Sequence, residues 1–423
     1  MMSKRTIDLD ISDPIALEII KDGHRHRTAC ISRRGRKSSL GTLDSLIRAV
    51  NLGWPHRLLT VAPVYEQSME CLEHAMQYYD VLMDDYKAGD RCLYSKNGGR
   101  IFFRSADNPQ NIRGKGYDHI HLVESAFIKD DTFHRSIRPT MSGSVNTTSF
   151  AESTIDNAGG WFYDRLCRGL DEPFPIKTDG GSFTYTPANQ HEAFKSWIVP
   201  AYDSPYLDKD EIAELKSSMP VKIFNNEYLC VPMLTGGSVF EHYKIEKYDF
   251  NVKCNNPIFG LDVAKENDYT VMIGLKHDGE AYRVVLFKRM NKQEYTKQMA
   301  ICGHFAKKYN GTVYIDHTGV GNAVSEMLAE HHDNIVDINF NANSKKQMVE
   351  NLCIMLEKDQ IIIPEECTDL LHELQVFTSK RTSAGNITYD APSGQHDDCV
   401  MSLALAAWGI TNGSGLYAEE IDY

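Results

Sequence analysis

The stretch "IFGLDVAKENDYTVMIGL", residues 258–275, decides the fold of the C-terminal half of the chain. Two apolar runs flank an acidic segment, and this pattern predicts two neighbouring strands joined by a turn. Asp262 ends the first run, and Asp268 stands just before the second. Because a carboxylate at the end of a buried strand is costly unless a cation pairs with it, the stretch also predicts a cation-binding position.

The rest of the C-terminal half continues as alternating strand and helix patterns. Asp278 and Gly279 separate two apolar runs and predict a tight hairpin turn. Strand patterns follow at residues 311–316, 334–340 and 361–364. Helical spacing of apolar residues is found at residues 293–309, 321–331, 345–358, 367–377 and 396–410. We therefore expect a sheet covered by helices.

Carboxylates occupy comparable places in these elements. Asp262 and Asp316 end strands, and Asp397 and Asp398 open the last helix. Strand ends at one edge of a sheet converge in space, and a helix start can face them. Such a cluster cannot ionise fully unless divalent cations bind it, and oxygen ligands suit Mg²⁺ or Mn²⁺. Two ions roughly 4 Å apart can activate water and stabilise the leaving oxygen in phosphodiester hydrolysis.

Each of these residues also has a purely structural interpretation. Asp397 or Asp398 could be a helix N-cap, because aspartate is favoured there, and Asp316 could cap a turn. Asp268 is a further candidate ligand, a residue that supports the ligands, or a polar turn residue. His396 is a candidate ligand, a proton shuttle, or an exposed neighbour of the helix start.

Length and composition exclude several classes of protein. With 423 residues the chain has room for two or three domains. Its ten cysteines form no CxxC pair, so neither a zinc ribbon nor a disulfide framework is expected, and we predict a reducing compartment. No apolar run is long enough to span a bilayer, and the start lacks the apolar core of a secretory signal. A net charge of -13 confines any nucleic-acid contact to a local surface.

The N-terminal half shows a regular strand–helix alternation. Strand patterns lie at residues 27–32, 57–64, 99–106 and 119–127, and helical patterns at 38–50 and 65–86. This order predicts a mostly parallel sheet covered by helices. Residues 171–257 follow a looser pattern rich in Pro, Gly and Asp, and residues 234–257 are the expected joint between domains.

The segment "ACISRRGRKSSLG", residues 29–41, lies between a strand and a helix, where a phosphate-binding loop belongs. Lys37 can reach the β- and γ-phosphates of a nucleotide, and Ser38 can bind Mg²⁺. Arg36 replaces the glycine expected before the lysine, and a side chain there hinders the approach of backbone to phosphate. Gly35, one position earlier, compensates in part.

Three C-terminal segments resemble a known family: "GLDVAKENDYTVMIGL", "YIDHTGVGNAV" and "GQHDDCVMSLALAAW". They are similar to the nuclease domain of tailed-bacteriophage terminase large subunits, which has a ribonuclease-H-like fold. The resemblance implies cleavage of double-stranded DNA by two-metal catalysis. It assigns the metal ions to Asp262, Asp316, Asp397 and Asp398.

The N-terminal half resembles the ATPase domain of the same family in "SRRGRKSS", "NPQNIRGKGYDHIHLVESAF", "NTTSFAESTIDNAGGWFYDRL" and "NNEYLCVPMLTGGSVF". The second segment corresponds to the Walker B strand, where Val123 replaces the expected aspartate and Glu124 is the candidate to orient the attacking water. Loss of that aspartate weakens Mg²⁺ binding. The third segment is similar to the coupling segment, with Thr147 and Thr148 expected to sense the γ-phosphate.

The basic loop leaves two interpretations open. Arg33 or Arg34 is a candidate arginine finger and nucleotide-binding residue. Alternatively, both belong to a solvated basic loop or contact DNA non-specifically together with His24, Arg25 and Arg27. The two departures at positions 36 and 123 leave either an ATPase that works with altered residues or a slow one, and we favour a working but divergent ATPase.

The resemblance implies an α/β chain with an ATPase-like motor domain at residues 1–240, a joint at 241–257 and a nuclease domain at 258–423. The region at about 171–240 forms a looser part of the first domain. The implied function is ATP-driven movement of viral DNA into a procapsid and cutting of the concatemer, with ATP, Mg²⁺ or Mn²⁺ bound. Implied partners are double-stranded DNA, a portal protein, a small terminase subunit and the procapsid. The resemblance also implies a ring of subunits during packaging in the host cytoplasm, and a free protein that can be monomeric.

Two other functions remain open on the sequence. A stand-alone metal-dependent DNA endonuclease would carry a degenerate, inactive nucleotide site. A non-catalytic scaffold would bind DNA or capsid through its acidic sheet. Measurements of ATP hydrolysis and DNA cleavage distinguish these alternatives.

Overall fold

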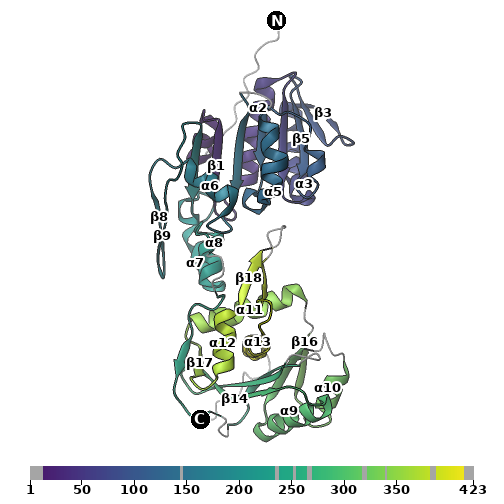
Figure 1. Ribbon diagram of the computed structural model, residues 1–423, viewed down its shortest axis with the longest axis vertical. Helices are drawn as coiled ribbons and strands as arrows, with labels where there is room; N and C mark the ends of the chain where they lie inside the picture. Colours follow the sequence, from purple (N-terminus) through teal and green to yellow (C-terminus); the bar gives the residue numbers. More distant parts are fainter. Residues whose placement is uncertain are drawn as a thin grey trace. The chain divides into compact units, whose positions relative to one another are not determined.

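The computed structural model describes residues 13–142, 146–233, 238–250, 254–263, 269–316, 322–338, 341–381 and 387–413. The chain divides into two compact units (Figure 1). The first unit is formed mainly by the chain up to Leu215 together with Lys222–Thr235, and the second mainly by Gly236–Arg381 and Ile387–Tyr423. None of the described helices is both long enough and apolar enough to cross a membrane.

The first unit is built on an eight-stranded sheet of order β10-β1-β7-β6-β2-β5-β4-β3. The strands from β10 to β5 run parallel, which confirms the predicted mostly parallel sheet. Their bounds are β1 His26–Ile31, β2 Arg57–Ala62, β3 Met83–Lys87, β4 Cys92–Ser95, β5 Arg100–Ser105, β6 His119–Leu122, β7 Thr148–Ser153 and β10 Phe194–Val199. A separate hairpin pairs β8 (Phe174–Thr178) with β9 (Gly181–Tyr185).

Helices cover both faces of this sheet. They are α1 Pro14–Lys21, α2 Lys37–Leu52, α3 Tyr65–Met76, α4 Tyr79–Leu82, α5 Asp130–Thr132, α6 Gly160–Arg168, α7 Lys209–Ser218 and α8 Val221–Glu227. Short helical turns lie at Pro109–Asn111, Ser125–Phe127, Phe133–Ile137 (η3), Arg138–Met141 (η4) and Ala201–Asp203. Apolar residues of α2 and α3 pack on β2 and β5, and α6 lies against β1 and β10.

The long helix predicted at residues 65–86 is wrong in its second half. Helix α3 ends at Met76, and β3 begins at Met83 as the edge strand next to β4. Leu82 and Met83 are buried in the core beside α2 and α3, so tertiary packing of these two side chains overrides the helical spacing.

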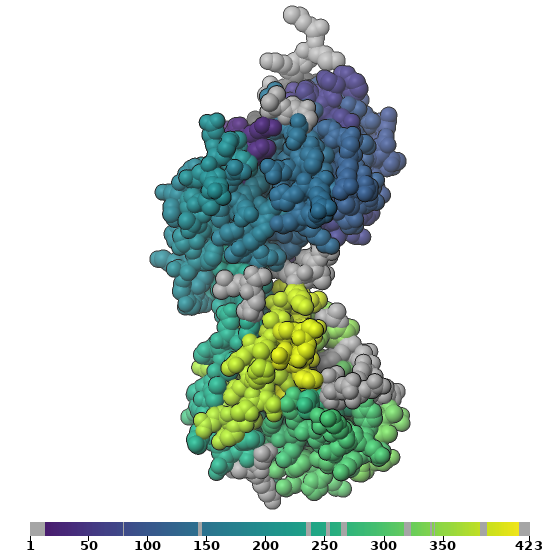
Figure 2. All heavy atoms as spheres, viewed as in Figure 1, coloured from purple at the N-terminus to yellow at the C-terminus, as the bar shows by residue number. Residues whose placement is uncertain are grey.

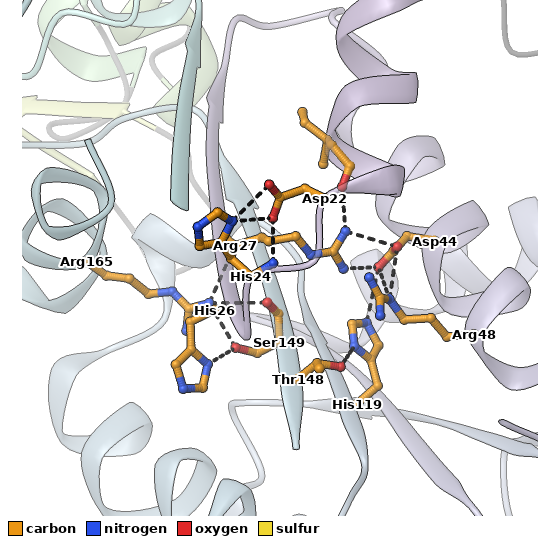
Figure 3. Close-up of polar contacts among 11 residues, drawn as sticks. Asp22, His24, His26, Arg27, Asp44, Arg48, His119, Thr148, Ser149 and Arg165 are labelled. Carbon is orange, nitrogen blue, oxygen red and sulfur yellow. Dashed lines mark hydrogen bonds and ion pairs between the residues drawn. The ribbon is translucent and has the colours of Figure 1, made fainter. Parts of the chain in front are cut away.

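A buried polar cluster ties β1 to α2 near the start of the strand (Figure 3). Arg27 is fully buried, and its guanidinium donates to Asp44 at 2.6 and 3.1 Å and to the carbonyl of Ile19 at 2.6 Å. His119 of β6 approaches the same carboxylate at 3.4 Å. Arg27 is therefore a structural residue, and the expectation that it contacts DNA on a surface loop is wrong.

The second unit contains a seven-stranded mixed sheet of order β11-β17-β14-β13-β12-β15-β16. The strands are β11 Lys244–Glu246, β12 Ile258–Asp262, β13 Thr270–His277, β14 Tyr282–Met290, β15 Thr312–Asp316, β16 Ile335–Ile338 and β17 Ile361–Pro364. Strands β13 and β14 form the hairpin predicted at Asp278 and Gly279. The segment expected to be a joint contributes β11, which pairs with β17.

Two helical layers enclose this sheet, with α9 and α10 on one face and α11 to α13 on the other (Figure 1). The helices are α9 Tyr295–Tyr309, α10 Asn322–Ala329, α11 Ala342–Glu357, α12 Thr368–Val376 and α13 Asp398–Asn412. A further hairpin pairs β18 (Thr378–Arg381) with β19 (Ile387–Asp390). In Figure 2 the yellow residues near the C-terminal end lie against green residues of the sheet, in agreement with the packing of α13 on β12 and β13.

Candidate functional site

Asp262 and Asp316 lie at equivalent ends of two neighbouring parallel strands. β12 pairs with β15 in a register that ends at Leu261 opposite Ile315, and each aspartate is the next residue. Leu261 and Ile315 point into the core formed with α9 and α10. Since successive side chains of a strand point to opposite faces, Asp262 and Asp316 both point to the face covered by α13.

Helix α13 brings the third acidic position to the same edge. Gly260 permits a very close approach, because a Cβ atom there would lie 1.9 Å from the carbonyl oxygen of Ser402. The Ser402 hydroxyl donates to the carbonyl of Gly260 at 2.9 Å and fixes this crossing. Asp398 lies one helical turn before Ser402, and Asp262 lies two residues after Gly260 on the same face of β12. We call Asp262, Asp316, Asp397 and Asp398 the carboxylate edge.

The charges of the other three aspartates act on the pKa of Asp262. Burial raises the pKa of Asp262 well above its usual value, and the negative charges of Asp398, Asp397 and Asp316 raise this pKa further. Lys345 of α11 opposes the shift. Its Nζ lies 3.0 Å from Asp397 Oδ2, so one ammonium group faces four carboxylates.

The start of α13 is capped by a residue of another helix. Glu373 of α12 accepts hydrogen bonds from the backbone N–H groups of Cys399 at 2.7 Å and Val400 at 3.3 Å. Asp397 makes no side-chain cap hydrogen bond. The interpretation of Asp397 and Asp398 as simple N-caps is therefore wrong, because Glu373 already satisfies these donors.

Two polar neighbours orient Asp398, whose side chain is largely buried. The backbone N–H of Tyr269 donates to its Oδ2 at 3.2 Å, and Nδ1 of His396 lies 3.7 Å from the same oxygen. His396 is half-buried and packs edge-on against the Tyr269 ring. This position keeps His396 a candidate ligand or proton carrier, whereas Asp268 lies outside the described residues.

The aspartates of the carboxylate edge lie at one edge of the sheet, but the described residues do not form a complete metal-binding geometry there. Among the described ranges of the chain, no three His, Cys, Asp or Glu side chains converge closely enough to hold a metal ion as they stand. The donor set nevertheless suits a hard divalent cation, because it consists of carboxylate oxygens around a buried aspartate.

Sequence reasoning missed Lys345 and Glu373. Lys345 belongs to α11 and Glu373 to α12, far along the chain from the strand ends that they support. Neither residue stands in a recognisable motif. Only the packing of both helices against α13 brings them to the carboxylate edge.

A second site lies at the carboxyl ends of the parallel strands in the first unit. Lys37 opens α2, and its Nζ forms an ion pair with Glu124 Oε1 at 3.0 Å. Burial alone would lower the pKa of Lys37, but the charges of Glu124 and Glu152 outweigh burial and raise this pKa above its usual value. Ser153, at the end of β7, donates to Glu124 Oε2 at 3.2 Å. We call Lys37, Glu124 and Ser153 the phosphate-loop site.

Arg36 stands in the loop immediately before α2. It adopts a left-handed backbone conformation, with φ of 55°, in which glycine would be expected. Its guanidinium stacks on the ring of Tyr206 at 4.5 Å from the centroid. A Cβ at Gly35 would lie 2.4 Å from Ile31 Cγ2, so glycine suits the turn there. The hindrance expected from a side chain at position 36 stays a prediction.

At the position that resembles Walker B, Val123 stands where an aspartate is expected, and the adjacent strand β7 contributes a buried glutamate, Glu152. Val123 is buried in the core beside α2 and α3, so it cannot replace the missing carboxylate. Glu152 of β7 is fully buried 3.5 Å from His121, and neither of its oxygens has a hydrogen-bond partner within the described part of the chain. Burial raises the pKa of Glu152, and the neighbouring charge of Glu124 raises it further. No motif signalled this residue, which lies within an ordinary strand pattern.

The structure places the remaining predicted nucleotide residues differently. Arg33 pairs with Glu227 at 3.8 Å and Arg34 with Glu211 at 3.0 Å, so carboxylates of the same unit hold both arginines. Thr148 begins β7 and contacts His119 Nδ1 at 2.8 Å, while Thr147 donates to the carbonyl of Tyr117. Both threonines lie at the opposite end of the parallel strands from Lys37, whereas Ser153 ends β7 and contacts Glu124. Ser38 stands in the first turn of α2 beside Lys37.

Comparison with known proteins identifies the family in both halves of the chain. The family described as "Terminase RNaseH-like domain" matches residues 259–407. The family described as "Terminase large subunit, T4likevirus-type, N-terminal" matches residues 80–247. The chain belongs to the terminase large subunit family. The family predicted from the sequence is thereby confirmed.

Individual relatives from the terminase family match either most of the chain or a part of it. The large terminase subunit of Thermus virus P23-45 is 27% identical over 436 residues, which cover 93% of this chain and 86% of that protein. A large terminase from a thermophilic bacteriophage, solved in complex with ADP, is 11% identical with a TM-score of 0.52, and the match covers 95% of this chain and 99% of that one. The nuclease of phage G20c, solved with magnesium, is 30% identical over 40% of this chain and 96% of its own, with a TM-score of 0.36. The comparison with the ADP-bound terminase confirms the predicted fold class.

Proposed function

We propose that this chain is an ATP-driven motor that moves double-stranded viral DNA into a procapsid and a two-metal endonuclease that cuts the concatemer. The carboxylate edge carries the proposal: four aspartates from two strands and one helix share a single edge of the sheet in a terminase nuclease fold. The phosphate-loop site supports the motor half, because Lys37 and Glu124 meet at the carboxyl ends of parallel strands.

In the nuclease half, Asp262, Asp316 and the Asp397–Asp398 pair would hold two divalent ions. When bound, such ions activate a water molecule and stabilise the leaving oxygen of a phosphodiester. The raised pKa of Asp262 opposes the ionised form that would bind a cation, and Asp397 would exchange its contact with Lys345. Glu373 holds the start of α13 in place, so Asp398 stays oriented during this exchange.

In the motor half, Lys37 would leave Glu124 and pair with the phosphates of ATP. The released Glu124 carboxylate can then accept a hydrogen bond from the attacking water and orient it. Ser153 already contacts Glu124, so it is placed to respond to the same change. Glu152 adds a buried carboxyl group beside Lys37, which compensates in part for Val123.

The proposed partners are duplex DNA, a portal protein, a small terminase subunit and the procapsid. A ring of subunits would act during packaging, and free chains could be monomeric. These assignments rest on membership of the terminase large subunit family.

The test measures plasmid cleavage in Mg²⁺ or Mn²⁺ and ATP hydrolysis by the same full-length protein. We expect Asp262→Asn to abolish cleavage and keep ATP hydrolysis, and Lys37→Ala to do the reverse. Glu330→Gln, an exposed carboxylate in the second unit, is the matched control and should change neither activity.

The outcomes separate the proposal from its alternatives. Cleavage without ATP hydrolysis by the parent protein would support a stand-alone nuclease with an inactive nucleotide site. Absence of cleavage with every divalent ion would overturn the nuclease assignment and support a scaffold.

A further inference from the structure

A basic cavity lies in the first unit at the starts of β1 and β10, with a volume of about 580 Å³. Residues of η3, η4 and α6 complete its wall. Four arginines (Arg25, Arg138, Arg165 and Arg168) and two histidines line it, and Asp164 is the only acidic residue among the described ones that line it. Because the whole chain carries a net charge of -13, this local excess of positive charge requires an explanation.

The cavity is separate from the phosphate-loop site. His26 is the first residue of β1, and the loop that leads to Lys37 follows Ile31 at the other end of the strand. Five residue steps of about 3.3 Å each separate the two ends by roughly 17 Å. A ligand in the basic cavity would therefore leave the phosphate-loop site free.

Arg165 is the central observation. Its side chain is buried, with the residue only 7% exposed, and it donates to Thr28 Oγ1 at 2.9 Å and to the carbonyl of Arg27 at 3.0 Å. It also donates to Ser149 Oγ at 2.9 Å (Figure 3). Nη1 has no partner among the described residues and is not sealed in the core, so it is available to the cavity that Arg165 lines. All of its partners are neutral.

The charge of Arg165 is not compensated within the unit. Burial and then the charge of Arg27 together lower the pKa of Arg165 to about 9, and no carboxylate is among the causes of this shift. His26 beside it is neutral at physiological pH, because burial and then Arg165, Arg25 and Arg168 lower its pKa to about 3. A buried guanidinium without an anionic partner is costly, and an anion in the cavity would remove this cost.

Aromatic side chains of the cavity wall pack against these basic residues and against one another. The Arg168 guanidinium lies over the Phe194 ring at 4.7 Å from its centroid, and the His26 ring packs against Phe194 in a tilted arrangement with the centroids 4.8 Å apart. Phe133 and Trp161 stack on each other at 3.7 Å. Arg138 lies exposed at the cavity and forms no ion pair with any described residue, so it can approach a ligand from the solvent side.

We propose that the basic cavity binds a phosphate group, supplied either by a DNA backbone or by a free nucleotide. Guanidinium groups match the oxygens of phosphate with paired hydrogen bonds, and several arginines around one cavity favour a group with more charge and more oxygens than a carboxylate. Arg165 would bind it from within, and Arg138 and Arg168 would close around it.

The test compares Arg138→Ala combined with Arg168→Gln against Arg135→Ala in the full-length protein. Arg135 is an exposed arginine of the neighbouring η3 turn that pairs with Asp131 and does not line the cavity, so it controls for loss of surface charge. Fluorescence anisotropy with a labelled 20-base-pair duplex in EDTA measures DNA binding without cleavage. Thermal shifts with inorganic phosphate and adenosine monophosphate, measured in a Lys37→Ala background, report on free phosphate.

For DNA, we expect the double variant to bind at least about tenfold more weakly, as for hydrogen bonds to a charged group. The slope of log affinity against log salt should fall by about one, since the lost phosphate contact contributes about 0.9. If the ligand is a free nucleotide, we expect the double variant to lose the thermal shift that inorganic phosphate and adenosine monophosphate produce in the Lys37→Ala background. Arg135→Ala should change the affinity less than about twofold.

Each result of these measurements either supports the proposed phosphate site or overturns it. Loss of duplex binding alone identifies the DNA backbone as the source, and loss of the thermal shift alone identifies free nucleotide. Equal effects of the double variant and Arg135→Ala, or no effect on any probe, would overturn the proposal. ATP hydrolysis without DNA should stay unchanged in the double variant, so failure here is distinct from failure of the proposed motor function.

Discussion

The phosphate-loop site and the carboxylate edge both place acidic groups at the ends of parallel strands, but their charge balance differs. Glu124 already has Lys37 at 3.0 Å and the Ser153 hydroxyl at 3.2 Å. Asp262 faces three other aspartates, and Lys345 is the cation that opposes them. In the phosphate-loop site, positive and negative charges are paired before a ligand binds. At the carboxylate edge, negative charge is in excess.

This difference determines what each ligand must do. On the proposed function, a nucleotide would have to break an ion pair that is already formed, so its binding would rearrange existing contacts. A divalent cation would relieve repulsion between like charges, so its binding at the carboxylate edge would stabilise the second unit. The following predictions test this contrast, beginning with the largest expected effect.

Asp316→Asn should reduce DNA cleavage by about a thousandfold or more. Removing one metal ligand forfeits several kcal/mol of stabilisation of the developing charge, and 1.36 kcal/mol corresponds to tenfold in rate. Initial rates of plasmid nicking in Mn²⁺ measure the effect. ATP hydrolysis should remain within about twofold, and a parallel loss of both activities would show that the two sites are not independent.

Glu124→Gln should slow ATP turnover by roughly 100-fold or more, within the range for loss of a group that positions the water. ATP binding should persist, because the glutamine is uncharged and Lys37 does not have to break an ion pair with it before it contacts the phosphates. Steady-state hydrolysis and equilibrium nucleotide binding measure the two quantities, with Glu66→Gln on the exposed side of α3 as control. Unchanged turnover would move the catalytic role to another group, with Glu152 as the first candidate.

Gly260→Ala should destabilise the second unit by about 1–3 kcal/mol, the usual range for an overpacked contact. The added methyl group would meet backbone atoms of Ser402 and Ala406 at 1.9 and 2.6 Å, so α13 must move. A lower melting temperature and slower cleavage are expected together. Gly23→Ala meets no atom within 4 Å and serves as control. A normal melting temperature would show that α13 can shift without cost.

Asp262→Asn should raise the melting temperature of the metal-free protein by a few degrees at pH 8. Folding raises the pKa of Asp262, so its ionised form destabilises the folded state at neutral pH, and this effect fades as pH falls toward the ordinary value near 3.9. Scanning calorimetry in EDTA from pH 4 to pH 8 measures it. Added Mg²⁺ should stabilise the parent more than the variant, and the exposed Asp333→Asn should behave like the parent.

Arg36→Gly should have the smallest effect, with the KM and kcat for ATP within about threefold of the parent. Relief of the left-handed conformation, roughly 1–2 kcal/mol, is offset by the entropy of glycine and the lost stacking on Tyr206, each about 0.5–1 kcal/mol. A large gain in ATP hydrolysis would instead show that the Arg36 side chain obstructs the phosphates. Arg135→Gly controls for loss of a surface charge.

Local patterns predicted much of both folds and failed where distant contacts decide. The strands around Asp262 and Asp316 and the hairpin at Asp278 follow from alternating apolar runs and turn residues. Strand β3 does not, because burial of Met83 overrides a helical pattern. The position of Thr148 was misjudged because a motif gives the order of residues but not the end of the strand on which they fall.

The sequence by itself determined the two α/β units, the acidic strand ends and the loop with Lys37, because periodicity and turn chemistry act over a few neighbouring residues. Only the tertiary structure decided that Glu373 caps α13, that Lys345 faces the aspartates, that Arg36 turns toward Tyr206 and that Arg165 lines a cavity without an acidic partner. These contacts join residues far apart along the chain, and their energies depend on burial and distance, which no local pattern encodes.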